Sequence, residues 1–376
     1  MGTTSNTTGI VRVESGADLN LGELTITHQG PVDGSGSLTV TGSGSTVNQS
    51  AGSALTLGHA TNGTATLTVE NGGVFNASNT GAINVNATGN LNVDSGTFQA
   101  RGPGASDDGG TINTSGTVTV TGNGLVNLNG KQPADYLTAV PAGQGGALNA
   151  TGGTIDLSGT ARILGSGGRA GDEFVGPAGG SLTITGGAAV SAVDSSLLEF
   201  NGGTGGSQVG FGVARPGGAG GTVTVTSGSL NLTGTAKLTL DGGLGGQPTA
   251  VASGGGQGGT GGTLSINGGS VMMDASALIS LGGGNGSRRS LSSSFPGGDA
   301  GAGGQVLLST GSMTINGGLL TLDAGTPATA TGGFPSGAPG AHGTIDVTGG
   351  TFEMNGGEVF TGTFQRSGVG IFNHND

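Results

Sequence analysis

Apolar and polar residues alternate along most of the chain in short runs of about five residues. Examples are LTITH, SLTVTG, ATLTVENG and GTVTVTSG, and each run is ended by Gly, Asn or Ser. A period of two is typical of a β-strand that buries one face. No stretch keeps apolar residues at the i, i+3, i+4, i+7 spacing of a helix. The pattern therefore predicts an all-β protein built from many short strands.

A longer unit recurs in the middle of the chain. GGTVTVTSGSLNLTGTAKLTLDGG (220–243), GGTLSINGGSVMMDASALISLGGG (261–284) and GGQVLLSTGSMTINGGLLTLDAG (303–325) each contain three strand-like pieces. The second Gly of the opening pair marks the repeat at Gly110, Gly146, Gly180, Gly221, Gly262, Gly304 and Gly343. A constant unit of three strands followed by a long Gly-rich excursion is typical of a solenoid and does not suit the short hairpins of a sandwich.

The apolar positions of the repeat recur as well. They are Val223, Val225, Leu230, Leu232, Leu238 and Leu240, then Leu264, Ile266, Val271, Met273, Ile279 and Leu281, then Val306, Leu308, Met313, Ile315, Leu320 and Leu322. Stacked coils would place like residues on one another in dry interior columns. We therefore predict a right-handed parallel β-helix of about ten or eleven three-strand coils, with Gly-rich loops stacked along one edge.

The turns between strands divide this continuous solenoid into three parts. Residues 1–108 are expected to form N-terminal coils with short turns, and residues 109–342 repeats with long Gly-rich loops. Residues 343–376 are expected to form a C-terminal coil and tail.

Each long loop except that at 244–260 carries one bulky aromatic residue, followed within a few positions by Pro. These residues are Tyr136, Phe174, Phe211, Phe295 and Phe334. They either pin the loops to the solenoid or form a stripe for lateral contacts or ligand stacking. Because disorder would not require this regular order, we expect the loops to stack in register as a second layer of extended, polyproline-II-like strands. Each aromatic side chain would then be more than half buried.

Composition narrows the function. Ten basic and 22 acidic residues give a net charge of −12, which argues against nucleic-acid binding. The chain has no Cys, so it has neither disulfides nor a thiolate metal site. It has 90 Gly without the strict collagen period, and no apolar run long enough for a membrane span. The opening MGTTSNTTG lacks the charged and apolar regions of a signal peptide, so an exported chain would be processed or excerpted.

Three segments carry a family resemblance. SALTLGHATNGTATLTVENGGVF and VESGADLNLGELTI resemble the short repeats of bacterial secreted surface proteins similar to autotransporter passenger domains. GTFQRSGVGIFN is similar to the terminal coils of such proteins. The resemblance implies a right-handed parallel β-helix, export, and a role in adhesion or in building an extracellular matrix.

Candidate chemistry is sparse. GQGGTG at 256–261 fits a phosphate-loop pattern, but a Gly content this high produces such matches by chance. The close acidic pairs Asp107–Asp108 and Asp172–Glu173 are far apart, and the four His residues are scattered. We therefore predict no enzyme and no catalytic, cofactor-binding or metal-binding residues, with weak Ca²⁺ binding at Asp107–Asp108 as an alternative.

These observations predict a non-enzymatic extracellular structural protein of a bacterial surface, a self-associating subunit of a fibre or matrix. Its copies would associate as a homo-oligomer or filament through the solenoid ends, whose strand edges are open, or through edge loops. The alternative is an adhesin that presents the Gly-rich loops as a binding face, with a cell-surface glycan as partner. Thr-x-Thr arrays such as Thr222 to Thr226 leave an ice-binding solenoid as a minor alternative, and a polysaccharide lyase is the other.

Overall fold

The chain folds into a parallel β-solenoid. The structure is a computed structural model that describes residues 8–22, 24–26, 34–49, 54–77, 82–102, 108–131, 141–208, 212–248, 253–288, 295–329, 335–366 and 368–374. Within these residues all regular elements are strands, and the strands of successive coils pair in parallel. The predicted fold class is therefore confirmed.

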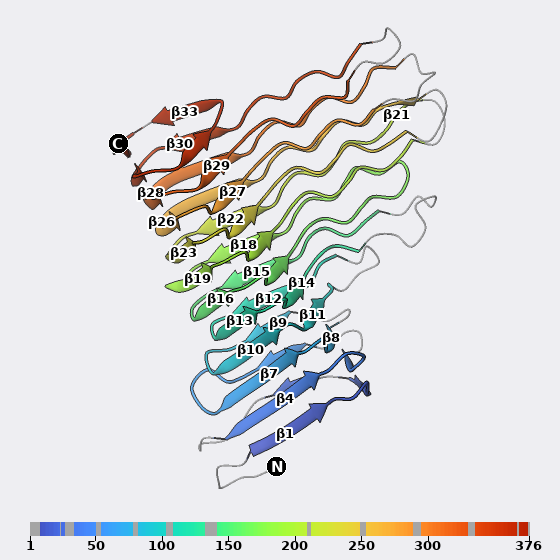
Figure 1. Ribbon diagram of the computed structural model, residues 1–376, viewed down its shortest axis with the longest axis vertical. Coiled ribbons are helices and arrows are strands. Elements are labelled where there is room, and N and C mark those ends of the chain that lie inside the picture. The colour runs from blue at the N-terminus through green and yellow to red at the C-terminus, as the bar shows by residue number, and fades with distance from the viewer. Residues whose placement is uncertain are drawn as a thin grey trace.

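The solenoid has three sides, each a ladder of strands (Figure 1). The first side contains β1 (Thr8–Val13), β4 (Ser35–Thr41), β7 (Thr64–Glu70), β10 (Gly89–Asp94), β13 (Thr117–Thr121), β16 (Thr154–Leu157), β19 (Ala188–Ala192), β23 (Gly228–Leu232), the later halves of β26 (Thr263–Met273) and β28 (Gln305–Ile315), β31 (Thr351–Met354) and β34 (Ile371–His374). The second side is an 11-stranded sheet, so the described chain makes eleven coils.

The strands of the second side are β2 (Asp18–Leu21), β5 (Thr46–Gln49), β8 (Val74–Ala77), β11 (Thr97–Ala100), β14 (Leu125–Asn127), β17 (Arg162–Leu164), β20 (Leu197–Glu199), β24 (Lys237–Thr239), β27 (Leu278–Ser280), β29 (Leu319–Thr321) and β32 (Glu358–Phe360). The third side contains β3 (Leu24–Ile26), β6 (Leu55–Leu57), β9 (Ile83–Val85), β12 (Thr111–Thr114), β15 (Ala147–Ala150), β18 (Ser181–Ile184), β22 (Thr222–Val225), the earlier halves of β26 and β28, β30 (Thr344–Val347) and β33 (Thr363–Arg366).

Two coils differ from the predicted three separate strands. In β26 and β28 the third-side strand continues into the first-side strand as one element of 11 residues, which joins the two sides into one sheet. The pairing register between β26 and β28 shifts on both sides of Asn267. A local irregularity of this kind bends a strand around a corner without ending it.

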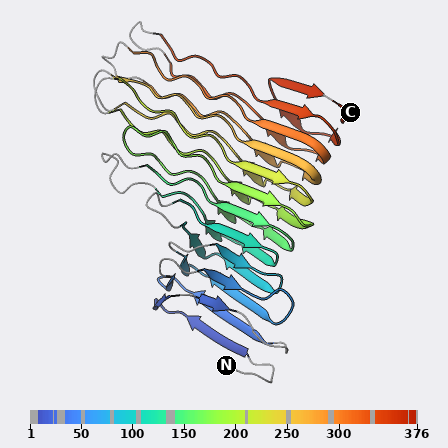
Figure 2. The same cartoon turned by 180° about the vertical axis from the view of Figure 1, so that it is seen from behind.

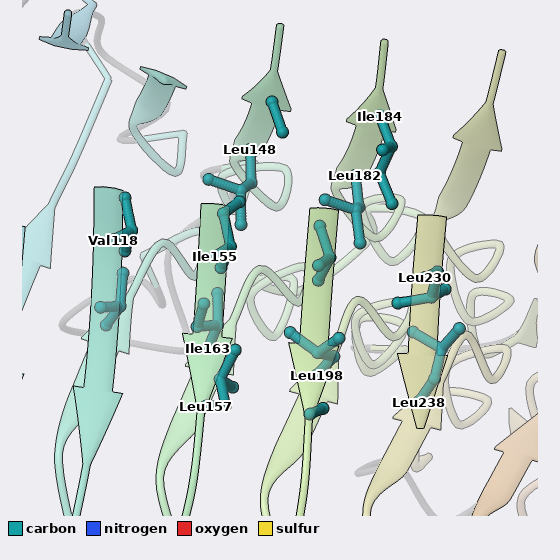
Figure 3. Close-up of a cluster of buried hydrophobic side chains, with 14 of the residues drawn as sticks. Val118, Leu148, Ile155, Leu157, Ile163, Leu182, Ile184, Leu198, Leu230 and Leu238 are labelled. Atoms are coloured by element: carbon teal, nitrogen blue, oxygen red, sulfur yellow. The ribbon is translucent and has the colours of Figure 1, made fainter. Parts of the chain in front are cut away.

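The interior consists of columns of like side chains. Val223 pairs with Leu264 in the next coil, and Leu264 pairs with Val306 in the coil after that. All of the apolar positions predicted from the repeat are at most 1% exposed. Figure 3 shows Leu148, Ile155 and Ile163, which come from the third, first and second sides, gathered in the same interior. The period-two pattern therefore predicted the inward face of every one of these strands correctly.

From β14 onward, the coils carry the long excursions. After each second-side strand the chain runs outward, and it later returns to begin the next third-side strand, as the paired wavy traces show (Figures 1 and 2). The traces lie side by side in both views. Across the described ranges, no helix is long and apolar enough to cross a membrane.

Replacing one interior Leu by a charged residue tests the inward register. Leu232 is fully buried on β23, while its neighbour Asn231 points outward and is partly exposed. We expect Leu232→Asp to lower the free energy of unfolding by about 4 kcal/mol or more, because an unpaired carboxylate would lie in a dry column. Asn231→Asp is the matched control and should change it by less than about 1 kcal/mol. Urea unfolding followed by circular dichroism measures both, and equal shifts of the two midpoints would show that the register is wrong.

Candidate functional site: a glycine slab and two apolar ends

The excursions form a two-layered plate, which we call the glycine slab. It comprises the described residues 128–131, 141–146, 165–180, 200–208, 212–221, 240–248, 253–262, 281–288, 295–304, 322–329 and 335–343. One layer contains the outgoing legs, such as 200–208, and the other contains the returning legs, such as 212–221. Both ends of each leg pair are fixed by solenoid strands, here β20 and β22. The coil spacing of the solenoid is therefore imposed on the slab.

Legs of the same layer are joined by backbone hydrogen bonds between successive coils. The N–H of Gly242 donates to the carbonyl of Gly282 at 2.8 Å, and the N–H of Gly245, three residues on, donates to Asn285 at 3.0 Å. The returning legs repeat the pattern, since Gly217 donates to Gln257 and Gly220 to Thr260. One bond every three residues is typical of the threefold polyproline II helix. The predicted in-register stacking of the loops is thus confirmed for the described legs.

A second set of bonds joins the two layers. Gly243 follows Gly242, and its N–H donates across the slab to the carbonyl of Gly218 at 2.8 Å. In return, the N–H of Gly218 donates to Gly203 at 2.8 Å. In each x-Gly-Gly triplet, the first Gly therefore binds the next coil and the second binds the opposite layer.

The layers approach so closely that a side chain cannot be inserted between them. A β-carbon added to Gly243 would overlap the carbonyl oxygen of Gly203 in the preceding coil, and one added to Gly218 would overlap that of Pro177. The obstacle in both cases is backbone, which cannot rotate away as a side chain can. Close backbone approach is a standard reason for Gly in an extended segment.

The residue x of each x-Gly-Gly triplet points outward, and side chains satisfy part of its backbone. The N–H of Asn201 donates to Ser166 Oγ at 3.0 Å, and the N–H of Asp241 donates to Asn201 Oδ1 at 2.7 Å. Asp241 Oδ1 in turn accepts the N–H of Gly282 at 2.6 Å. Small polar side chains in this outward column therefore each satisfy a backbone donor of the next coil.

The prolines of the described slab occupy different positions of the triplet. Pro216 occupies an outward position, immediately before Gly217. The last excursion is different, because Pro327 and Pro339 occupy the position of the first Gly of the triplet, where Gly286 and Ala300 of the preceding coil donate onward. A residue without an N–H cannot extend the slab by another layer. The last excursion therefore presents an edge that is blocked at two donor positions.

Of the aromatic residues predicted to pack the loops, two lie within the described ranges. Phe174 and Phe295 are both partly buried. The carbonyl of Phe174 accepts the N–H of Gly206 at 2.8 Å, and the β-carbon of Phe295 lies beside Gly254 of the preceding coil. Tyr136, Phe211 and Phe334 lie outside the described residues. A role of this set as an interface stays a prediction.

The titratable residues considered from the sequence are dispersed. Asp108 Oδ1 accepts the N–H of Gln144 at 2.8 Å, and Asp107 lies outside the described ranges. Asp172 is buried, whereas Glu173 is exposed. Among the described residues, no three His, Asp or Glu side chains come close enough to hold a metal ion. His342 Nδ1 lies 3.2 Å from Asp323 Oδ1 on the last excursion.

Exposed apolar side chains gather at the two ends of the solenoid. Among the described residues, seven of the ten exposed large hydrophobic residues lie in the first and last coils: Ile10, Val11, Phe360, Phe364, Val369, Ile371 and Phe372. Buried Phe352 contacts Phe364 and Phe372, with ring centroids 5.5 and 5.7 Å apart. The sequence repeat did not single out these residues.

One ion pair lies beside the exposed residues of β1. Arg12 Nε donates to Glu14 Oε2, and both side chains are about half exposed. The hydrogen bond to Glu14 and the charge of its carboxylate raise the pKa of the Arg12 guanidinium. Arg12 therefore stays charged at any physiological pH, and its charge is locally balanced.

A methyl group inserted into the slab tests the close approach of its legs. We expect Gly243→Ala to lower the free energy of unfolding by about 3 kcal/mol or more, because the β-carbon must displace backbone of the preceding coil. Thr260→Ala, at an exposed outward position of a returning leg, is the control and should be nearly neutral. Differential scanning calorimetry compares the two, and a Gly243→Ala protein as stable as the control would contradict the packing described for the slab.

No protein-family model matches the chain, and no curated protein sequence matches it either. The similarity to bacterial surface-repeat proteins therefore rests on the repeat segments alone, and the function has to be inferred from the geometry.

Proposed function

We propose that the chain is a non-enzymatic extracellular structural protein of a bacterial surface, a rod whose copies associate into a fibre or matrix. The observation that carries the proposal is the location of the exposed apolar residues. Among the described residues, seven of the ten exposed large hydrophobic residues lie in the first and last coils. Exposed apolar patches of soluble proteins usually mark contact sites.

Strand edges without a pairing partner lie in the same end coils as the exposed apolar residues. Within the described residues, β32 and β33 each pair with a strand on one edge only, and so do β1, β2 and β3. Each edge leaves N–H and C=O groups that another strand can satisfy. Apolar residues next to unpaired edges favour the addition of a further coil from another molecule.

The non-enzymatic and extracellular parts of the proposal rest on the sequence. The two lysines, Lys131 and Lys237, are far apart in the sequence, and so are the acidic pairs, so no grouped acid and base is recognisable in the sequence. The absence of Cys and the similarity to autotransporter passengers support export to a bacterial surface.

One observation favours an adhesin as a second candidate. The slab holds the ends of successive loops in a fixed register, as the pairing of β21 (Gly212–Val213) with β25 (Ser253–Gly254) illustrates close to where two loops rejoin their returning legs. Binding residues are often carried on loops that a rigid scaffold positions. On this proposal a surface glycan would bind along the outer rim of the slab.

Concentration-dependent association distinguishes the two candidates. A fibre subunit should form filaments visible by negative-stain electron microscopy, and its sedimentation coefficient should rise with protein concentration. An adhesin should remain a single rod at every concentration and should be retained on a glycan array. Rods that stay monodisperse up to millimolar concentration would contradict the structural role.

The second expectation concerns turnover. Pectin, alginate and other acidic polysaccharides should remain intact after incubation with the protein, with or without Ca²⁺, as measured by the absorbance of unsaturated products and by reducing-end release. Product formation that is lost in an Asp172→Asn variant would contradict the non-enzymatic role.

A further inference from the structure

We propose that two copies of the chain pack face to face, with their solenoids antiparallel, through the second side and the outgoing layer of the slab. The two-fold axis runs along the strand direction, between β24 and β27. The inference deepens the proposed structural function and rests on it, because it specifies a second copy as the lateral partner of the rod and fixes the register of the contact.

The second side differs from the other two in the residues that it turns outward. From β17 to β32 it carries five large apolar side chains at outward positions, all of them at least partly exposed: Leu164, Leu197, Leu278, Leu319 and Phe360. Among the described strands of the same six coils, the first side carries one such residue, Met272, and the third side one, Leu307. Apolar side chains gathered on one side of a rod indicate a contact surface.

The outward positions of the second side form two columns. One column contains Arg162, Leu197, Lys237, Leu278, Leu319 and Glu358. The other contains Leu164, Glu199, Thr239, Ser280, Thr321 and Phe360. Because a two-fold axis along the strands reverses the order of the coils and keeps the position along each strand, every column faces its own copy in the partner.

The outgoing legs of the slab continue this side without a break. The N–H of Leu240 donates to the carbonyl of Ser280 in the next coil at 2.8 Å, and the N–H of Gly242 donates to Gly282 at the same distance. The ladder of β24 and β27 therefore runs on into the legs, and the two form one surface. Among the described outgoing legs, Leu244 is the one exposed large hydrophobic residue, at 51%.

Two opposite charges determine the register. Arg162 on β17 and Glu358 on β32 are both exposed, and neither forms an ion pair within the described part of the chain. With the axis between β24 and β27, Arg162 of each copy faces Glu358 of the other. The pair therefore forms twice, once at each end of the contact, and charge complementarity of this kind selects one register over others.

The apolar residues of the second side match in the same register. Leu164 of one copy faces Phe360 of the other, and Leu197 faces Leu319. Phe360, which is 50% exposed in the single chain, is covered in the pair. Burial of these side chains stabilises the contact, since the apolar area is removed from water.

The outgoing legs also fit together about this axis. Leu244 belongs to the coil of β24, so its two copies lie side by side at the axis. Asp241 faces Gly282, which has no side chain to obstruct the carboxylate. The six strands and four facing legs span roughly 750 Å² on each copy. A stable interface buries about 800 Å² on each partner, so the surface is large enough to hold a second copy.

Other arrangements lose these matches. A shift by one coil in one direction brings the Lys237 side chains of the two copies opposite each other, and a shift in the other direction brings Glu358 opposite Leu197. In a pair with parallel solenoids and level coils, the two columns would face each other, so that Leu197 meets Glu199. The antiparallel register is the one that pairs opposite charges and apolar residues together.

A charge swap tests the partner and the register. Arg162→Glu and Glu358→Arg should each raise the dimer dissociation constant at least about tenfold, because like charges then meet twice. The double variant Arg162→Glu/Glu358→Arg should return it to within about threefold of the wild type. Asp156→Arg reverses an exposed charge on the first side of the coil that contains Arg162, and this control should leave the constant unchanged.

Analytical ultracentrifugation below the concentration of filament formation measures these constants. Single variants that dimerise like the wild type would overturn the proposal. A double variant that stays as weak as the single variants would overturn it as well, since the two residues then do not face each other.

Lys237 distinguishes this register from one shifted by two coils. In the proposed register the two Lys237 side chains flank the axis, so Lys237→Met should tighten the dimer. In a register centred between β27 and β29, Lys237 would face Glu358, and the same substitution would weaken the dimer. A weaker Lys237→Met dimer would therefore show that the proposed register is wrong.

Cross-linking tests the position of the axis on the slab. The chain has no Cys, so Leu244→Cys introduces one thiol, and a short bismaleimide should join two copies into a dimer and nothing larger. Thr260→Cys, at an exposed position of the opposite layer, is the control and should stay monomeric. A dimer from Thr260→Cys and none from Leu244→Cys would show that the wrong face of the slab was chosen.

Electron microscopy separates failure of this inference from failure of the proposed function. Wild-type filaments should contain paired rods that run in opposite directions, and Arg162→Glu filaments should be single rods. Arg162→Glu filaments that remain paired would overturn the lateral contact and leave the structural role standing. A wild-type chain that stays monomeric up to millimolar concentration would overturn both.

Discussion

The whole molecule depends on one constraint: each solenoid strand has its backbone hydrogen-bonding partners in the coils next to it. In the solenoid, interior columns of Val, Ile and Leu add burial to this pairing. The slab has little such burial, and fixing a Gly-rich backbone costs about 1–2 kcal/mol per residue in conformational entropy. Its legs are ordered because strands such as β20 and β22 hold both ends of each excursion in register. The apolar solenoid thus positions the legs, and the hydrogen bonds of the slab then fix them.

Sequence reasoning succeeded where burial sets the pattern. Leu264 and Val306 could be placed in one interior column because side chains alternate strictly along a strand, and a slip of one residue would expose all of them. The chain path through β26 and β28 was not predicted, because Gly and Asn at a corner signal a turn as readily as a bend. Of the candidate residues, Phe174 and Phe295 could be found as loop aromatics, but their partners depend on how neighbouring loops stack.

The detailed bonding of the slab was missed for a different reason. Glycine carries no hydrophobic signal, so an x-Gly-Gly period such as Asn201-Gly-Gly-Thr204-Gly-Gly-Ser207 reads as low complexity. The period becomes informative only when it is matched to a helix of three residues per turn, in which two faces are packed and one is free. The outward residues then explain the polar column from Ser166 to Asp241, and the position of a Pro within the triplet indicates whether a further layer can follow.

In a solenoid, the residue type at each position of a column depends on the coils that lie on either side of it. In an interior coil, an outward position with a coil on either side is satisfied by Ser or Thr, as in Ser229 and Ser270. An Ile in that position gains nothing from the coil beneath it alone, and exposing it to water is unfavourable. In a quasi-one-dimensional fold, the residue types of a column therefore reflect the coils on either side of each position.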